Sequence, residues 1–127
     1  MSVYLDTHVA VWLATGKIKK LTRDATRALD SSDPLISPIV LVELEYLHEI
    51  GKLPRSASAI LNQLQSLLGI QVSDLPFPVV AQAALFETWT RELFDRIIVA
   101  QARSDGYSGL VSADEKIKRN YSMTIWD

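Results

Sequence analysis

Cysteine is absent from the sequence of 127 residues, which excludes disulfide bonds, thiolate zinc sites and cysteine nucleophiles. No apolar run approaches the roughly 20 residues that a membrane-spanning helix requires. The first residues also lack the basic region and apolar stretch of a secretory signal. We therefore expect a cytoplasmic protein with no membrane partner.

An excess of charge of either sign is also missing, because 13 basic and 15 acidic residues give a net charge of −2. Such a balance provides no overall attraction to nucleic acid. The basic side chains are nevertheless clustered, and two interpretations stay open: solvated helix faces, or contact with a nucleic-acid backbone. The first basic group comprises Lys17, Lys19, Lys20, Arg23 and Arg27, and the second comprises Lys116, Lys118 and Arg119.

Short apolar strands alternate with helical patterns along the chain, and there is no repeat, low-complexity segment or linker. Strands are predicted at 2–5, 35–37, 70–72 and 109–112, with an edge strand at 124–126. Helices are predicted at 7–15, 22–29, 38–51, 56–68, 79–87, 94–104 and 112–120. This alternation is typical of a parallel sheet with helices on both faces. The sequence thus predicts one α/β domain over residues 1–127.

Two acidic residues follow predicted strands directly. Asp6 comes after the first strand, and Asp114 comes after the strand at 109–112. In α/β proteins, ligands and catalytic groups lie beyond the carboxyl ends of the strands, so both positions suit a reactive carboxylate. The alternative for Asp6 is a helix N-cap. Ser112 and Glu115 form a Ser-x-x-Glu capping box, which would leave Asp114 without a capping role.

Two further acids lie on apolar stripes of predicted helices. Glu43 shares a stripe with Val40 and Leu44, and Asp95 shares one with Ile98. A carboxylate on an apolar stripe is costly unless it is paired or bound to a metal. For Asp95 the alternative is an acid in the first turn that the helix dipole favours.

The predicted topology can bring Asp6, Glu43, Asp95 and Asp114 to one edge of the sheet. Two carboxylates about 4 Å apart repel by roughly 4 kcal/mol at an effective dielectric constant near 20, so they must be protonated, separated or bridged by cations. Oxygen ligands without cysteine or a histidine pair select hard ions such as Mg²⁺ or Mn²⁺. Hydrolysis of phosphodiester bonds uses ions held in this way.

The histidines and tryptophans do not form a rival site. For His8, capping or packing is the simpler role, and His48 is expected at the surface. The tryptophans are expected in the core or at an interface rather than as a platform for base stacking. They are Trp12, Trp89 and Trp126.

Four segments carry these acids, and together they resemble the PIN domain, more narrowly the VapC-type toxins of bacterial toxin–antitoxin pairs. The segments are Leu5-Asp6-Thr7-His8, Glu43 within 37–44, Phe94-Asp95-Arg96 with the helix to Ala102, and Ser112-Ala113-Asp114. The resemblance covers essentially the whole chain. Its most specific parts are the Phe-Asp-Arg helix and the Ser-Ala-Asp turn.

The resemblance implies a Mg²⁺- or Mn²⁺-dependent endoribonuclease with a parallel sheet and a shared acidic pocket. It also implies a homodimer that a VapB-like antitoxin blocks, often through a basic side chain that enters the pocket. The family's four acids correspond to Asp6, Glu43, Asp95 and Asp114, and its small polar neighbours to Thr7 and Ser112.

One segment departs from the family pattern. Relatives often carry Asp-Pro-Phe-Asp-Arg before the third acid, where this chain has Glu-Leu-Phe-Asp-Arg at 92–96. The first acid is therefore one methylene longer, and the rigid proline is replaced by leucine. On this ground Glu92 is placed outside the predicted site.

The sequence therefore predicts a nuclease in which Asp6 and Asp95 hold the principal ion and Glu43 and Asp114 complete the pocket. The first basic group is the candidate for contact with the RNA backbone. A phosphoacceptor receiver domain is disfavoured, because it would need a phosphorylatable Asp after a middle strand and a Lys after a late one. The sequence has neither in a convincing place. Phosphatases of the haloacid dehalogenase type would need an acid in place of His8. A non-catalytic PIN-like module that binds RNA or protein is the alternative.

Overall fold

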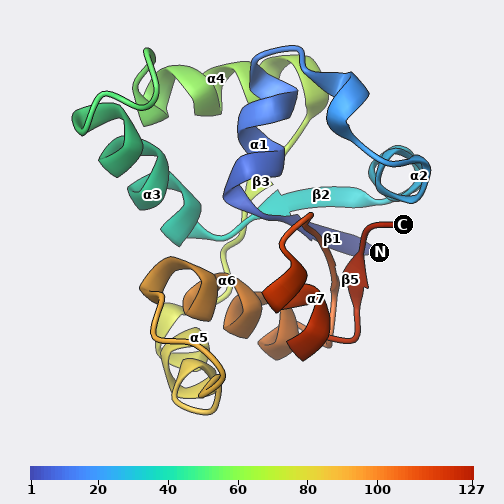
Figure 1. The fold of residues 1–127 in the computed structure, drawn as a ribbon, viewed down its shortest axis with the longest axis vertical. Coiled ribbons are helices and arrows are strands. Elements are labelled where there is room, and N and C mark those ends of the chain that lie inside the picture. The colour runs from blue at the N-terminus through green and yellow to red at the C-terminus, as the bar shows by residue number, and fades with distance from the viewer.

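Five parallel strands form the centre of the computed structural model, which describes residues 1–127 (Figure 1). They are β1 (Ser2–Leu5), β2 (Asp33–Ile36), β3 (Gln71–Val72), β4 (Gly109–Val111) and β5 (Thr124–Ile125). Their order across the sheet is β3-β2-β1-β4-β5, and every neighbouring pair is parallel. The predicted parallel sheet and the edge position of the last strand are confirmed.

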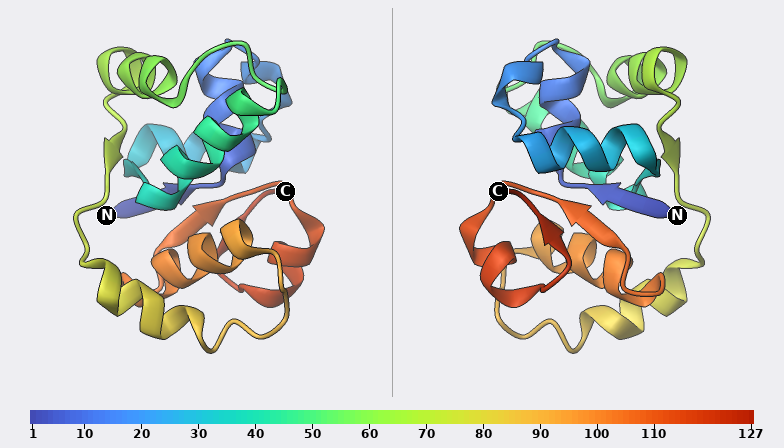
Figure 2. Two further views of the ribbon diagram at one scale, coloured as in Figure 1. Left: turned by 90° about the vertical axis from the view of Figure 1, so that its left-hand side faces the viewer. Right: turned by 90° about the vertical axis from the view of Figure 1, so that its right-hand side faces the viewer.

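Helices cover both faces of this sheet, as the alternating pattern predicts. Figure 2 shows α1–α4 on one side of the sheet and α5–α7 on the other. The helices are α1 (Thr7–Ala14), α2 (Arg23–Ser31), α3 (Pro38–Glu49), α4 (Ala57–Leu68), α5 (Phe77–Ala84), α6 (Leu93–Ser104) and α7 (Glu115–Asn120), with a short 3₁₀ helix η1 (Ile18–Lys20). None of them is both long enough and apolar enough to cross a membrane.

The direction in which the chain adds strands reverses at β1. From β1 the chain builds β2 and then β3 on one side, and it returns through α5 and α6 to add β4 and β5 on the other. Open α/β sheets bind ligands at such a reversal, beyond the carboxyl ends of the two diverging strands. Asp6 follows β1 and Ser112 follows β4, so both residues lie at this point.

One hydrophobic cluster of 21 buried residues joins the central strands to helices on both faces. Leu5 of β1 and Leu110 of β4 are completely buried, as are Leu44 of α3 and Ile117 of α7. Full burial of such a side chain contributes roughly 1.5–3 kcal/mol to stability. The strands are thereby held firmly, and so are the residues that follow them.

A buried hydrogen-bond network connects α6 to the sheet and to the start of α3. The Gln101 side chain accepts from the Ser37 hydroxyl at 3.0 Å and donates to the hydroxyls of Tyr4 at 3.3 Å and Ser73 at 3.2 Å. The Tyr4 hydroxyl donates to the Asp105 carboxylate at 2.6 Å. Because Ser37 is the N-cap of α3, the network fixes two helices that carry predicted site acids relative to one another.

The bounds of several elements differ from the predicted ones by one to three residues. The helix predicted at 79–87 begins at Phe77 and ends at Ala84. The strand predicted from 35 begins at Asp33 and includes Pro34, whose backbone partner is Val3. Proline is tolerated near the first residue of a strand, because only one ladder hydrogen bond is lost there.

Candidate active site

Asp6 is the first residue after β1 and also the N-cap of α1. Its Oδ1 accepts a hydrogen bond from the Thr7 backbone nitrogen at 2.7 Å, and its Oδ2 accepts one from the Ser112 hydroxyl at 2.7 Å. Asp6 is only 5% exposed. Burial raises the pKa of Asp6, and the two hydrogen bonds oppose this rise without cancelling it. Capping and a place in the pocket are therefore compatible for this side chain.

Ser112 connects Asp6 to Asp114, because its hydroxyl also accepts from the Asp114 backbone nitrogen at 3.1 Å. The prediction that Ser112 caps the last helix is wrong. Asp114 is the N-cap of α7, and its Oδ1 accepts from the backbone nitrogens of Lys116 at 2.8 Å and Ile117 at 2.9 Å. The backbone is still extended at Asp114, so the helix begins later than the capping box suggests. The cap uses Oδ1 alone.

Glu43 reaches the same place from α3. Its Oε1 accepts a hydrogen bond from the Thr7 hydroxyl at 2.5 Å, and Thr7 adjoins Asp6 in the chain. Glu43 is half-buried, and burial raises its pKa. The hydrogen bond from Thr7 lowers this pKa, whereas repulsion from Asp6 and Glu92 raises it further. Thr7 therefore connects two acids, through its backbone nitrogen and through its hydroxyl.

Asp95 lies in the first turn of α6, and the pKa of its carboxyl group is strongly raised. Its pKa is raised to about 8, first by burial and then by repulsion from Asp6, Glu92 and Asp114. Each of these charges disfavours the ionised form. Asp95 therefore lies within electrostatic reach of acids from two other parts of the chain, as well as of Glu92 at the start of its own helix.

Glu92 is predicted to lie outside the site, but its charge acts on two of these acids. It is the N-cap of α6, and its carboxylate accepts from the backbone nitrogens of Phe94 at 3.2 Å and Asp95 at 2.8 Å. Its charge raises the pKa of both Glu43 and Asp95. The available sequence signal was an acid directly before a predicted helix, but glutamate is not among the preferred N-cap residues.

The structure thus gathers Asp6, Glu43, Asp95 and Asp114 at the reversal of the sheet. No three acidic or histidine side chains adopt an arrangement that would hold a metal ion. The donor set still suits a hard divalent cation, because every ligand atom is a carboxylate oxygen. Several of these carboxyls also carry raised pKa values, and a cation would relieve that repulsion. Binding of Mg²⁺ or Mn²⁺ here stays a prediction.

The two histidines lie in different settings. His8 is exposed and does not cap α1, and its ring centroid lies 6.5 Å from that of Trp12. Trp12 in turn lies 5.9 Å from Trp126, and both indoles are partly buried against the core, as expected. His48 is half-buried rather than at the surface, with its Nδ1 2.9 Å from a backbone carbonyl oxygen of the α3–α4 loop.

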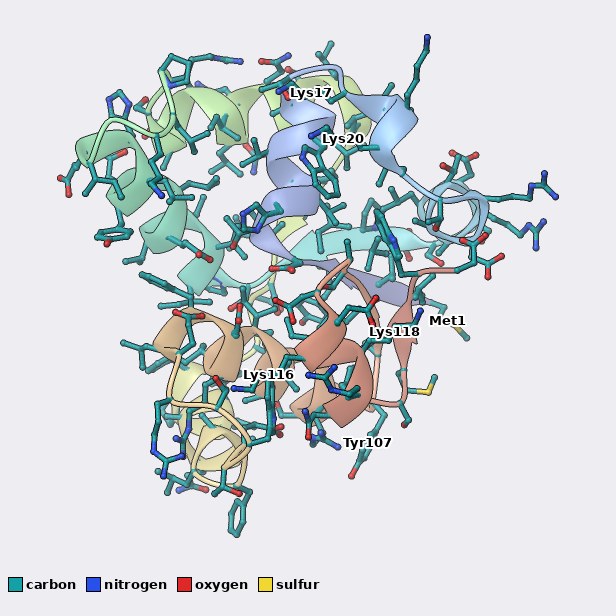
Figure 3. The ribbon with its side chains drawn as sticks, in the orientation of Figure 1. Met1, Lys17, Lys20, Tyr107, Lys116 and Lys118 are labelled. Carbon is teal, nitrogen blue, oxygen red and sulfur yellow. The ribbon has the colours of Figure 1, made fainter.

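Both basic groups are exposed. Figure 3 shows Lys17 and Lys20 near the end of α1, and Lys116 and Lys118 on α7. The Lys20 ammonium lies 5.3 Å from the centroid of the Trp12 ring, which is a cation–π contact. Exposure is compatible with both interpretations of these groups, so a role in binding RNA stays a prediction.

The chain is similar to a solved structure described as VapBC2 from Rickettsia felis bound to a DNA fragment from their promoter, with a TM-score of 0.68, 20% sequence identity and 100% of each chain covered. No curated protein sequence matches significantly. At this identity the structural likeness concerns the fold alone. The family model of the PIN domain matches residues 3–122, and the chain therefore belongs to the PIN domain family.

Proposed function

We propose that the chain is a metal-dependent endoribonuclease, the toxin of a type II toxin–antitoxin pair. The observation that carries this proposal is the group Asp6, Glu43, Asp95 and Asp114 at the reversal of the sheet, where the pKa of Asp95 is raised to about 8. Strongly perturbed titratable groups at such a place favour a functional site. Membership of the PIN domain family and the likeness to a VapBC2 structure support the toxin assignment.

Asp6 and Asp95 would hold the principal ion, Mg²⁺ or Mn²⁺, and Glu43 and Asp114 would complete the pocket. When bound, the ion supplies positive charge that activates a water molecule and stabilises the charge that develops on the phosphate. Asp6 needs little reorganisation for this role, because Thr7 and Ser112 already hold its two oxygens.

The remaining steps fall to side chains whose positions the fold restrains. Thr7 holds Glu43 through Oε1, so Oε2 is the oxygen that can orient the attacking water and take its proton. A carboxylate with a raised pKa is better suited to this than an ordinary one. Ser112 donates a hydrogen bond to Asp6 and accepts one from the backbone nitrogen of Asp114. These two bonds fix the position of one acid relative to the other.

The proposed partners follow from the same charges. RNA is the substrate, and its backbone would contact the first basic group of Lys17, Lys19, Lys20, Arg23 and Arg27. A VapB-like antitoxin would block the enzyme by placing a basic side chain among the acids, where it relieves the repulsion that raises the pKa of Asp95. The active form would be a homodimer.

Cleavage of defined RNAs by the purified protein tests the proposal, with Mn²⁺ or Mg²⁺ and then with EDTA. We expect cleavage that requires the ion and is lost in Asp95→Asn. Asp33→Asn is the matched control, because it removes the same charge from an exposed position at the opposite, amino-terminal edge of the sheet. Cleavage retained in Asp95→Asn would overturn the assignment. RNA binding with neither cleavage nor Mn²⁺ binding would instead support a non-catalytic module.

A further inference from the structure

Three helices begin beside the acid pocket, and a carboxylate caps each of them. Asp6 caps α1 and Asp114 caps α7, so two of the pocket acids are themselves caps. In α6 the two tasks are divided between two residues. Glu92 is the N-cap, and Asp95, in the first turn, lies within electrostatic reach of the other acids. The proposed reaction does not use Glu92.

The Glu92 carboxylate uses both of its oxygens on the backbone of α6. Oε1 accepts from the Phe94 nitrogen at 3.2 Å, and Oε2 accepts from the Asp95 nitrogen at 2.8 Å. Asp114, by contrast, makes both of its capping bonds with Oδ1. Glu92 is therefore bonded directly to the backbone of the residue whose side chain is proposed to hold the ion.

The loop that ends at Glu92 is fixed by a side chain of the same helix. The Arg96 guanidinium donates to the carbonyl oxygens of Ala84 at 2.8 Å and Leu85 at 3.3 Å, at the end of α5. It also donates to the carbonyl oxygen of Thr90 at 3.3 Å. The buried Thr90 hydroxyl accepts from the Glu92 nitrogen at 3.0 Å. Glu92 is exposed, but its backbone and its carboxylate are both held at the start of α6.

The charge of this cap has a consequence for a bound cation. The amino end of a helix carries roughly half a positive elementary charge. A cation held by Asp95, in the first turn of α6, would be repelled by that charge. One carboxylate at the N-cap exceeds the half charge and reverses its sign. The charge of Glu92 also contributes to the raised pKa values of Glu43 and Asp95, so it acts within the pocket.

We propose that Glu92 is a positioning residue for the cation: it holds the backbone of Asp95 and cancels the positive end of α6, without binding the ion itself. The inference rests on the proposed function, which requires a divalent ion in this pocket. A neutral cap would satisfy the same backbone nitrogens, but it would leave the charge of the helix end in place. The negative charge of Glu92 is therefore the property that the ion requires.

Binding of Mn²⁺ can be measured without RNA, from the EPR signal of the free ion or by titration calorimetry. Glu92→Gln should raise the dissociation constant for Mn²⁺ roughly 3- to 30-fold. This range is twice the usual free energy of a unit charge at a helix end, because the ion carries two charges. The difference from the unmodified protein should shrink as KCl is added, since salt screens exposed charges. A role in folding alone would give no such salt dependence.

Two further variants separate the charge of Glu92 from its hydrogen bonds. Glu92→Asp and Glu92→Asn both introduce preferred N-cap residues, but only aspartate is charged. We expect Glu92→Asp to keep the affinity for Mn²⁺, and Glu92→Asn to lose as much affinity as Glu92→Gln. Melting curves should show that all three variants are folded, because Glu92 is exposed.

The chain supplies a matched control in Asp24, an exposed acid in the first turn of α2. Asp24→Asn removes the same charge from the start of a helix that lies away from α6 in Figure 1. It should leave the dissociation constant for Mn²⁺ unchanged.

Two outcomes would overturn the inference: an unchanged affinity for Mn²⁺ in Glu92→Gln, or equal affinities in Glu92→Asp and Glu92→Asn. If Mn²⁺ binding still requires Asp95 in that case, the proposed metal site stands without Glu92. Failure of the proposed function gives a different result. Mn²⁺ binding that depends on the charge of Glu92, without cleavage of RNA, would support the inference and overturn the nuclease. A protein that binds no Mn²⁺ would overturn both.

Discussion

The carboxyl group of Asp95 has a pKa of about 8 in the folded protein, against a usual value of 3.8. Between these values the folded protein holds more protons at this site than the unfolded chain does. Without metal, the free energy of unfolding should therefore fall as the pH rises from about 4 towards 8. Below about pH 4 the group is protonated in both states, and the destabilising contribution is absent.

Asp95→Asn should reduce this pH dependence, because the amide keeps the size of the side chain without its charge. The raised pKa values of Asp6 and Glu43 account for the part that remains. In EDTA, thermal melts should show a higher melting temperature for Asp95→Asn than for the unmodified protein near pH 8. The difference should shrink as the pH falls towards about 4. Asp33→Asn, at an exposed site, serves as the control. Parallel melting curves for Asp95→Asn and the unmodified protein would contradict the burial and repulsion inferred at Asp95.

A second prediction at the residue scale concerns the hydroxyl of Thr7. Thr7→Val preserves the shape of a buried side chain but removes the donor to Glu43. Losing a partner of this kind costs roughly 1–3 kcal/mol. The pKa of Glu43 should rise further, because the hydrogen bond from Thr7 now lowers it.

The acidic limb of the pH–rate profile for RNA cleavage should therefore move to higher pH in Thr7→Val. Thr7→Ser restores a hydroxyl at the same position and should restore most of the profile. If Thr7→Val cleaves RNA with an unchanged profile, Thr7 does not position Glu43.

At the scale of elements, the short helix α7 has Asp114 as its N-cap, and this residue has two roles. Asp114 caps α7 through Oδ1, and it is also proposed to complete the acid pocket. The roles can be separated because asparagine caps a helix as well as aspartate does, but it is neutral. Asp114→Asn should keep the stability of the protein, whereas Asp114→Ala should lose about 1 kcal/mol.

Both Asp114 variants should lose most RNA cleavage, because the charge is gone in each. Denaturant melts measure the stability of each variant, and cleavage assays measure its activity on RNA. Full cleavage by Asp114→Asn would mean that Asp114 is a helix cap and nothing more.

For the molecule as a whole, repulsion among the clustered acids lowers the stability of the folded protein, and a bound cation would reduce this repulsion. Titration with Mn²⁺ should raise the melting temperature, with a stabilisation of roughly 2.7 kcal/mol at a concentration one hundred times the dissociation constant. Asp6→Asn and Asp95→Asn should reduce this gain strongly, and Asp33→Asn should keep it. A melting temperature that does not respond to Mn²⁺ would contradict the proposed metal site.

The proposed homodimer also belongs to this scale. Val42 and Tyr46 of α3 are 55% and 48% exposed, and the Tyr46 ring lies 5.9 Å from that of Phe94. A stable interface buries roughly 800 Å² on each partner, and apolar side chains at its centre dominate binding. We expect a dimer in sedimentation velocity, and a shift to monomer when Val42→Lys and Tyr46→Lys are combined. Leu67→Lys, at another exposed apolar position on α4, should leave the dimer intact.

The sequence by itself determined the type and order of the elements, because these depend on neighbouring residues. Apolar spacing and caps predict α4, which begins after Ser56 and ends at Gly69, where a positive φ of 66° suits glycine. Alternation of strands and helices predicts the parallel sheet. The bounds of α5 and the cap of α7 were predicted less well, since several local signals compete at helix ends.

The tertiary structure alone decided which strands are neighbours. Nothing in β1 or β4 specifies that they pair, yet this pairing brings the Ser112 hydroxyl to 2.7 Å from Asp6. The contact between Trp12 and Trp126 has the same origin. Local patterns predict which residues can serve a site, but distances between remote residues depend on how the buried surfaces of all the elements fit together. The raised pKa of Asp95 follows from those distances, so it could be read only from the folded chain.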